Sequence, residues 1–273
     1  MESTLLVQPR IARIAEYAKF SKEIGAGFEL IEPSYPDHLD NLDAYLEEIH
    51  RWVPPSAVQA VHGPFLDIVL HSPDPAIREV SERRVRESLD FCERAGARFL
   101  LLHSNHLPLI REHDYDEIWL QRNAEFLSGL EPRLRAAGIT LVMENMWDAD
   151  PRLLVRLVRA VSSPSVALCL DVAHQRVHGS GGLRSWWETA GSLTPYVQYG
   201  DNSGAADEDL ALGEGTVDWP TLDACLRGTA HAPVVMAGVG FDAGTAKLRR
   251  SLDFLEDNGF FPFPAAPGKH SRT

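Results

Sequence analysis

The sequence has no long apolar run and no recognisable export signal. None of its segments approaches the roughly 20 consecutive apolar residues that a membrane helix needs. The first residues, Met1–Thr4, lack the basic and then apolar regions of a secretory signal. Hydrophobic residues make up 44% of the chain and charged residues 24%, which is typical of a globular domain. We therefore expect a cytoplasmic protein that has no membrane partner.

Basic residues and cysteines are also scarce. Lys and Arg number 26 against 39 acidic residues, which gives a formal net charge of −13. Because nucleic acids are bound through clustered Lys and Arg, we expect no nucleic-acid partner. The three cysteines, Cys92, Cys169 and Cys225, are far apart and form no Cys-x-x-Cys pair. We interpret them as small buried hydrophobic residues.

Short apolar segments alternate with amphipathic ones along the whole chain. The expected strands are 4–8, 27–33, 58–62, 98–103, 139–144, 166–171, 196–201 and 233–238; the expected helices are 11–24, 42–53, 75–95, 115–137, one beginning at 150–151, one around Trp186, 219–226 and 246–256. Such an alternation predicts a parallel sheet, and eight units indicate a closed α/β barrel. We predict a single-domain (β/α)8 TIM barrel over residues 1–260 and a flexible tail over 261–273.

Several expected strands end abruptly on a polar residue. The clearest are 141–145, which ends on Glu144 and Asn145, and 168–174, in which Asp171 is followed three residues later by His174. In a TIM barrel the carboxyl ends of the strands form the active-site face, so these side chains should converge. The expected ring of polar strand ends and neighbouring residues comprises Glu29 or Glu32, His62, His103, Glu144, Asp171, His174, Gln198 and Asp201.

Carboxylates and imidazoles gathered in this way can coordinate a divalent ion or form acid and base pairs. Each histidine alone also fits a hydrogen-bonded core residue, and His174 fits a loop residue in the turn after the sixth strand. Trp147 follows Glu144 closely and suits either a wall for the carbon skeleton of a substrate or a lid on the rim. We favour the wall.

Seven short segments carry a resemblance to a known family. They are Gly27–Leu30, Val61–Pro64, Leu102–Ser104, Met143–Asn145, Leu170–His174, Asp201–Asn202 and, most specifically, Leu210–Trp219. Together they resemble the xylose-isomerase-like TIM barrel superfamily, in particular its sugar phosphate isomerase and epimerase group, to which endonuclease IV is related. The resemblance covers nearly the whole chain.

The resemblance implies a metal site that is only partly retained. Members of this group hold one divalent ion with Glu, Asp, His and Glu from strands five to eight. The first two ligands carry over as Glu144 and Asp171, but Gln198 and Ala237 occupy the other two positions. With two of four ligands replaced, the resemblance implies at most a weakly bound Mg²⁺ or Mn²⁺ on Glu144, Asp171 and Gln198.

Without a cation between them, Glu144 and Asp171 cannot both ionise easily, so one carboxyl should have a raised pKa that suits a general acid. We hypothesise an isomerase, dehydratase or cyclising enzyme that needs no cofactor and acts on a small oxygenated substrate, sugar-like or polyhydroxy and keto. The expected catalytic residues are Glu144, Asp171, His174 and His103; the expected substrate-binding residues are His62, Glu29, Trp147, Gln198 and Asp201.

Two alternatives stay open. The first is a non-catalytic ligand-binding or accessory protein on a degenerate epimerase scaffold. The second is a metal-dependent sugar isomerase or epimerase with an unusual ligand set, either the one above or His62, His103 and Glu144, which resembles one metal subsite of endonuclease IV. A DNA repair enzyme is not expected, because Asp207 and Asp209 differ from the other subsite residues beside His174. The pair Trp186-Trp187 suits either a homodimer interface or a helix face packed on the barrel.

Overall fold

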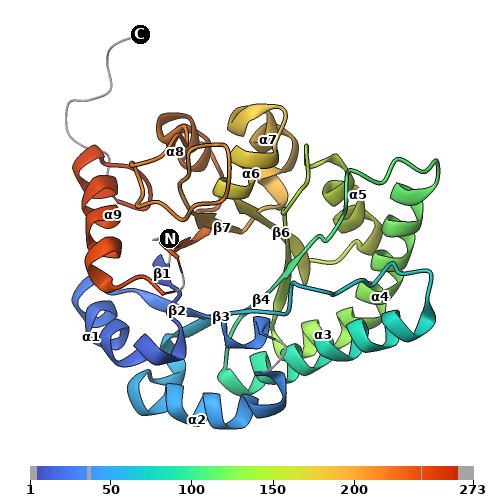
Figure 1. The fold of residues 1–273 in the computed structure, drawn as a ribbon, viewed down its shortest axis with the longest axis horizontal. Coiled ribbons are helices and arrows are strands. Elements are labelled where there is room, and N and C mark those ends of the chain that lie inside the picture. The colour runs from blue at the N-terminus through green and yellow to red at the C-terminus, as the bar shows by residue number, and fades with distance from the viewer. Residues whose placement is uncertain (1–4, 36–37, 241, 264–273) are drawn as a thin grey trace.

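The strands form a closed barrel. The computed structural model describes residues 5–35, 38–240 and 242–263. Eight parallel strands pair in sequence order and β8 closes on β1. The strands are β1 Leu5–Val7, β2 Gly27–Leu30, β3 Val58–His62, β4 Phe99–His103, β5 Thr140–Glu144, β6 Val166–Asp171, β7 Tyr196–Tyr199 and β8 Val234–Ala237. Figure 1 shows the helices arranged around this ring. The predicted (β/α)8 TIM barrel is confirmed.

The helices connect successive strands on the outside. They are α1 Ile14–Ile24, α2 Leu42–Trp52, α3 Pro75–Ala95, α4 Tyr115–Ala137, α5 Arg152–Val161, α6 Val172–His178, α7 Gly182–Ala190, α8 Trp219–Arg227 and α9 Thr245–Asn258. The predicted bounds of α3 and α4 are confirmed. Each of these helices ends at a glycine with left-handed backbone, Gly96 and Gly138, which an L side chain would strain. None of the described helices combines the length and apolar character needed to cross a membrane.

Between β6 and β7 the chain forms two helices where the sequence predicted one. Helix α6 begins directly after β6, because the side chain of Asp171 caps it by accepting a hydrogen bond from the backbone N–H of His174. Helix α7 follows and buries Trp186, whose exposed fraction is 4%. The pair Trp186-Trp187 therefore lies on a helix face packed against the barrel, which is one of the two expected placements.

Side chains alternate along each strand between the barrel interior and the layer under the helices. One cluster of buried residues fills the interior: Leu6, Ala60, Leu101, Val142, Cys169, Tyr196 and Met236. Their chain neighbours, such as Val7, Val61 and Met143, belong to the outer cluster. Two residues beyond each interior residue, the same face of the strand reaches the carboxyl end of the barrel. On six strands that position is Gln8, His62, His103, Glu144, Asp171 or Gln198.

This alternation corrects one prediction. Ala237, to which the resemblance assigned the last metal-ligand position, belongs to the outer cluster, whereas Met236 points into the barrel. The next inward residue of β8 is Gly238, which lines the cavity at the carboxyl end. The prediction was wrong by one residue because a shift of one moves a side chain to the other face of a strand. Gly238 has no side chain, so neither position supplies a ligand.

The barrel extends beyond residue 260. Phe261 has an exposed fraction of 9% and packs with the outer cluster. Its backbone N–H donates to Asp223, and its carbonyl accepts a 2.9 Å hydrogen bond from the hydroxyl of Tyr199. Residues 261–263 therefore pack with the barrel; the rest of the expected tail, 264–273, lies outside the described residues.

Candidate active site

A cavity of about 180 Å³ lies at the carboxyl ends of the strands. Six of the residues expected from the sequence line it: His62, His103, Glu144, Asp171, His174 and Gln198. A larger cavity of about 830 Å³ is lined by residues around Trp187, Thr194 and His231. It lies at the amino ends of β6, β7 and β8, opposite the carboxyl face. Because TIM barrel active sites lie at the carboxyl face, the smaller cavity is the candidate site.

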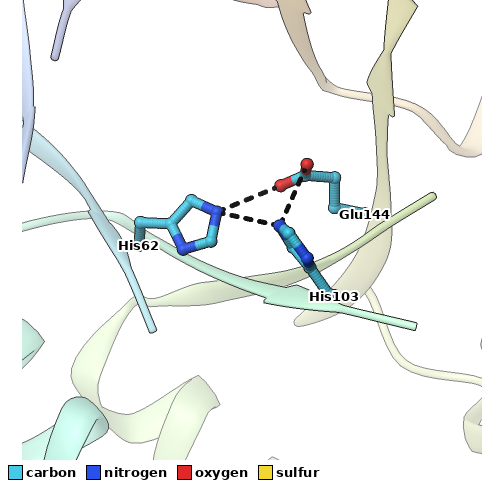
Figure 2. A group of neighbouring side chains, drawn as sticks. All are labelled: His62, His103 and Glu144. Carbon is cyan, nitrogen blue, oxygen red and sulfur yellow. Dashed lines mark hydrogen bonds and ion pairs between the residues drawn. The ribbon is translucent and has the colours of Figure 1, made fainter. Parts of the chain in front are cut away.

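The side chains of His62, His103 and Glu144 meet at one point (Figure 2). The Nε2 atoms of the two imidazoles are 3.2 Å apart. Glu144 Oε2 lies 3.4 Å from His62 Nε2, and Glu144 Oε1 lies 3.2 Å from His103 Nε2. The carboxylate is 1% exposed, and neither of its oxygens accepts a well-aligned hydrogen bond from the part of the chain that the structure describes. The two ring nitrogens are within hydrogen-bond distance of each other, but the buried carboxylate they face lacks a well-aligned donor.

This triangle fits the ligand shell of a divalent ion. Zn²⁺ binds imidazole nitrogen and carboxylate oxygen at about 2.0–2.1 Å, so two ligands of a tetrahedral ion are roughly 3.3–3.4 Å apart. The observed separations of 3.2 to 3.4 Å between the two Nε2 atoms, and between each of them and one oxygen of the Glu144 carboxylate, agree with that value. His62 also makes a 2.9 Å contact from Nδ1 to the carbonyl of Gly63, which fixes the tautomer that leaves Nε2 as a ligand.

A second group, Glu144, Asp171 and His174, lies within metal-binding reach but is less suited to it. His174 Nδ1 is 2.9 Å from the carbonyl oxygen of Asn145. A carbonyl oxygen only accepts, so Nδ1 carries the proton and cannot bind a metal while this hydrogen bond persists. The other nitrogen, Nε2, lies 3.4 Å from Asp207. His174 is therefore held as a hydrogen-bond donor, and the first trio is the better metal site.

Helix α6 and Asn145 place Asp171 and His174 beside Glu144. The Asn145 side chain donates from Nδ2 to the carbonyl of Asp171 and accepts from its backbone N–H, at 3.0 and 2.9 Å. This pair of bonds ties the end of β5 to the end of β6. His174 was expected in the turn leaving the sixth strand; it lies instead in the first turn of α6, because Asp171 is an effective helix cap.

The two buried carboxyls differ in their pKa values. Burial raises the pKa of Asp171 to about 7, and the charge of Glu144 adds to this although His174 opposes it. Burial also favours a higher pKa for Glu144, but the charge of His103 and contacts with His174 and His62 hold it well below its usual range. One carboxyl of the pair thus has the raised pKa expected of a general acid.

Glu29 lies just below the cavity and is fully buried. Its Oε1 accepts hydrogen bonds from the amide nitrogens of Gln8 and, at 3.0 Å, Gln198, while the hydroxyl of Tyr196 donates to Oε2. Burial raises the pKa of Glu29 to about 7. Glu29 therefore supports two cavity-lining amides and does not itself line the cavity.

Asp201 and Trp147, both expected to bind substrate, do not line the cavity. Asp201 is fully buried and accepts hydrogen bonds from the backbone N–H groups of Asn202, Gly213 and Val217, and from the indole of Trp219. It holds the long loop after β7 by bonding to Gly213, Val217 and Trp219 within the segment Leu210–Trp219. Trp147 is half-buried, and Phe65 and Met146 form apolar walls instead.

The sequence reasoning missed Gln8, Phe65, Met146 and Tyr196. Gln8 had a readable signal, since it lies two residues beyond the buried Leu6 and thus on the same strand face. Phe65 and Met146 come from loops whose course depends on the folded barrel. Their side chains carry no motif.

The sequence profile of the xylose isomerase-like TIM barrel family matches residues 19–258. The chain belongs to this family. The chain is 24% identical over 166 residues to MJ1311 of Methanocaldococcus jannaschii, an uncharacterized protein among the curated ones. That match covers 58% of this chain and only 56% of the relative's own length.

Two solved structures resemble this xylose isomerase-like barrel along its length. The protein TTHB071 of Thermus thermophilus, solved after soaking with ZnCl2, has a TM-score of 0.72 and 25% identity over 94% of this chain and 99% of that one. The 3-keto-D-glucoside 4-epimerase YcjR of E. coli has a TM-score of 0.71 and 17% identity, over 93% of this chain and 99% of that one. The likeness to YcjR shows the shared fold alone.

Proposed function

We propose that this protein is an isomerase or epimerase of a small polyhydroxy or keto substrate, assisted by a divalent ion on His62, His103 and Glu144. The observation that carries the proposal is the triangle of two Nε2 atoms and a carboxylate, with separations of 3.2 to 3.4 Å. It favours the metal-dependent alternative over metal-free acid–base chemistry, because the buried carboxylate otherwise lacks well-aligned donors. The ZnCl2 soak of TTHB071 makes zinc the first ion to test.

When bound, the ion would act as a Lewis acid toward a substrate carbonyl or hydroxyl oxygen. The chain supplies the proton-transfer groups beside it. Asp171 lines the cavity, and burial raises its pKa to about 7 when no ion is bound. The charge of a bound ion would lower this pKa and favour the ionised carboxylate, which suits Asp171 as the base. The backbone N–H of His174 donates to Asp171 Oδ1 at 2.7 Å and fixes the orientation of the carboxyl.

The cavity wall formed by β8 bears on the reaction type. This strand presents Gly238 to the cavity, so it offers no carboxylate opposite Glu144 and Asp171. Epimerisation by two opposed carboxylates therefore lacks one base. An isomerisation through an enediol needs only one carbon base. Asp171 would remove the proton from the carbon next to the carbonyl and return it to the former carbonyl carbon on the same side, while the hydroxyl proton passes to the former carbonyl oxygen, and we favour this reaction.

The test combines metal analysis with variants of the trio. Protein purified without chelator is analysed by plasma mass spectrometry and titrated calorimetrically with zinc, manganese and magnesium. We expect near-stoichiometric metal in the native protein and a loss of at least about tenfold in metal affinity in His62→Ala and His103→Ala. His231→Gln, an exposed histidine away from the cavity, is the control. No bound metal and no binding of any of the three ions would contradict the proposal.

A binding or accessory role without catalysis is the second candidate, favoured by the missing carboxylate on β8. Incubation of the metal-loaded protein with aldose and ketose pairs in D2O distinguishes the two. Isomerisation or deuterium uptake at the carbon next to the carbonyl supports the enzyme. A sugar that binds but is recovered unchanged and unlabelled supports the accessory protein.

A further inference from the structure

The side chains that line the cavity include many hydrogen-bond acceptors. Four carboxylates face it: Glu144, Asp171, Asp207 and Asp209. Among the described residues that line it, none is Lys or Arg. Three imidazoles also line it: His62 and His103 are the proposed metal ligands, and His174 already lies against Glu144, Asp171 and Asp207. Away from the metal ligands, an anionic group on a ligand would therefore lie beside carboxylates, because the remaining imidazole is already paired with them.

Two amides add further acceptors. Gln8 and Gln198 both line the cavity, and both donate from Nε2 to Oε1 of Glu29. Because a carboxylate oxygen is an acceptor, these bonds determine which end of each amide turns toward Glu29. The amide oxygens are left for the cavity. Each of them accepts a hydrogen bond from a ligand hydroxyl but repels a phosphate or carboxylate oxygen.

Three basic side chains that contact a lining residue or lie within two positions of one in the chain are already bound elsewhere. Lys247 donates from Nζ to the backbone carbonyl of Asp209. Arg176 donates from Nε to the carbonyl and hydroxyl of Thr216, at 3.1 and 2.9 Å. Arg10 lies 3.6 Å from the Glu32 carboxylate, with its guanidinium 4.0 Å from the ring centre of Tyr35. None of the three lines the cavity as the structure describes it.

Apart from the carboxylates, the amides and the three imidazoles, the lining is mainly apolar and is formed in part by Phe65, Met146 and Met236. A volume of about 180 Å³ suits a ligand smaller than a drug-sized molecule. A carbon chain that carries several hydroxyls matches both surfaces, because its C–H groups pack on the apolar wall and its O–H groups donate to the acceptors.

We infer that the cavity selects an uncharged, hydroxyl-rich substrate and rejects its phosphorylated or carboxylated counterparts. The inference rests on the proposed function in so far as this cavity is the substrate site, but it concerns binding and not turnover. It narrows the substrate class to free sugars or polyols, although the resemblance includes sugar phosphate isomerases.

The experiment is calorimetric titration of the metal-loaded full chain with matched pairs of ligands. The pairs are D-fructose with D-fructose 6-phosphate, D-tagatose with D-tagatose 6-phosphate, and D-galactose with D-galacturonate. We expect at least one uncharged sugar to bind, and its charged partner to bind roughly 100-fold more weakly, because like charges in a partly buried site repel strongly. A charged member that binds as tightly as its parent, or the failure of every uncharged member to bind, would overturn the inference.

A pair of variants tests whether the lining carboxylates cause the discrimination. Asp209 lines the cavity at a backbone φ of +51°, which Asn tolerates, so Asp209→Asn removes a charge with little strain. Glu208 is exposed on the same segment and does not line the cavity, so Glu208→Gln is the matched control. Asp209→Asn should reduce the discrimination about fivefold and Glu208→Gln should leave it unchanged. Equal effects of both variants would show that a general surface field is responsible and would overturn the inference.

The outcome also separates this inference from the proposed function. Selective binding of uncharged sugars without turnover keeps the inference and contradicts the proposed enzyme. Turnover of a phosphorylated sugar keeps the enzyme and overturns the inference.

Discussion

Replacing Asp201 with Asn should strongly destabilise the protein even though the side chains have the same shape. The Asp201 carboxylate is fully buried and accepts four hydrogen bonds. Two go to Oδ1, from the backbone N–H groups of Asn202 and Val217 at 3.0 and 3.1 Å. The other two go to Oδ2, from the N–H of Gly213 at 2.8 Å and the indole of Trp219 at 3.1 Å.

The magnitude follows from which of these bonds an amide can keep. Whichever oxygen becomes NH2, two of the four donors lose their acceptor and face another donor. A hydrogen bond to a charged group contributes about 1.5–3 kcal/mol, so the loss of two should cost about 3–6 kcal/mol. The loop between Asp201 and Trp219 cannot turn its donors to water easily, because a β-bridge from Asp201 to Leu210 holds its start.

The assay is urea unfolding followed by circular dichroism and tryptophan fluorescence. The control is Glu208→Gln on the same loop, where an exposed carboxylate accepts one hydrogen bond from the N–H of Ser203, at 2.7 Å. The control should change the free energy of unfolding by less than about 0.5 kcal/mol. A loss of less than about 1 kcal/mol in Asp201→Asn would refute the reasoning and reopen a role for Asp201 in substrate binding.

Three other predictions concern β8, a buried histidine and a glycine. Ala237→Glu should destabilise the barrel by about 3 kcal/mol or more, since it buries a charge under the helices. Gly238→Glu should fold and bind zinc more tightly, because its side chain would face the cavity. Equal free energies of unfolding in urea for the two variants would contradict the assigned strand faces. Burial and the charge of His106 lower the pKa of His71 to about 4, below the roughly 6.5 of an unfolded chain. Because the unfolded chain then binds more protons, stability should fall by about 1–2 kcal/mol, allowing for solvent screening, as the pH drops from 6.5 to 4; the difference in urea midpoint between native protein and His71→Gln should show this, and parallel pH profiles would contradict it. Gly215→Ala should cost about 2–4 kcal/mol or prevent folding, because a Cβ there would lie 2.2 Å from Asp201 Oδ1 and 2.5 Å from the carbonyl of Asn202; Gly129→Ala, with open space around its Cβ, is the control in thermal melts.

Some site residues could be found from the sequence because of where they lie on their strands. His62, His103, Glu144 and Asp171 each end an apolar strand, and a polar residue at that point of a barrel faces the active-site end. Asp201 also follows an apolar strand, but it lies an odd number of residues after the inward-facing Gln198. The inward face of β7 holds Tyr196 and Gln198, so Asp201 lies on the other face and supports the loop.

Other features depended on contacts that the sequence pattern does not contain. The sequence predicted a turn around His174 because seven residues are too few to show helical periodicity, whereas the Asp171 cap produces α6. The orientation of the Gln198 amide likewise depends on Glu29, which is 169 residues away in the chain and accepts a hydrogen bond from its nitrogen.

The sequence by itself determined the number and order of strands, the long helices and the set of polar residues at the strand ends. Each of these depends on local patterning, namely apolar runs, helical periodicity, and glycine or aspartate at helix ends. Only the tertiary structure decided that His62 and His103 face Glu144 at metal-ligand spacing, that Asn145 holds His174 as a donor, and that the described lining of the cavity carries acceptors without Lys or Arg. Those facts depend on how the closed barrel brings separate strands together. The distance between two strands cannot be read from the order of residues along the chain.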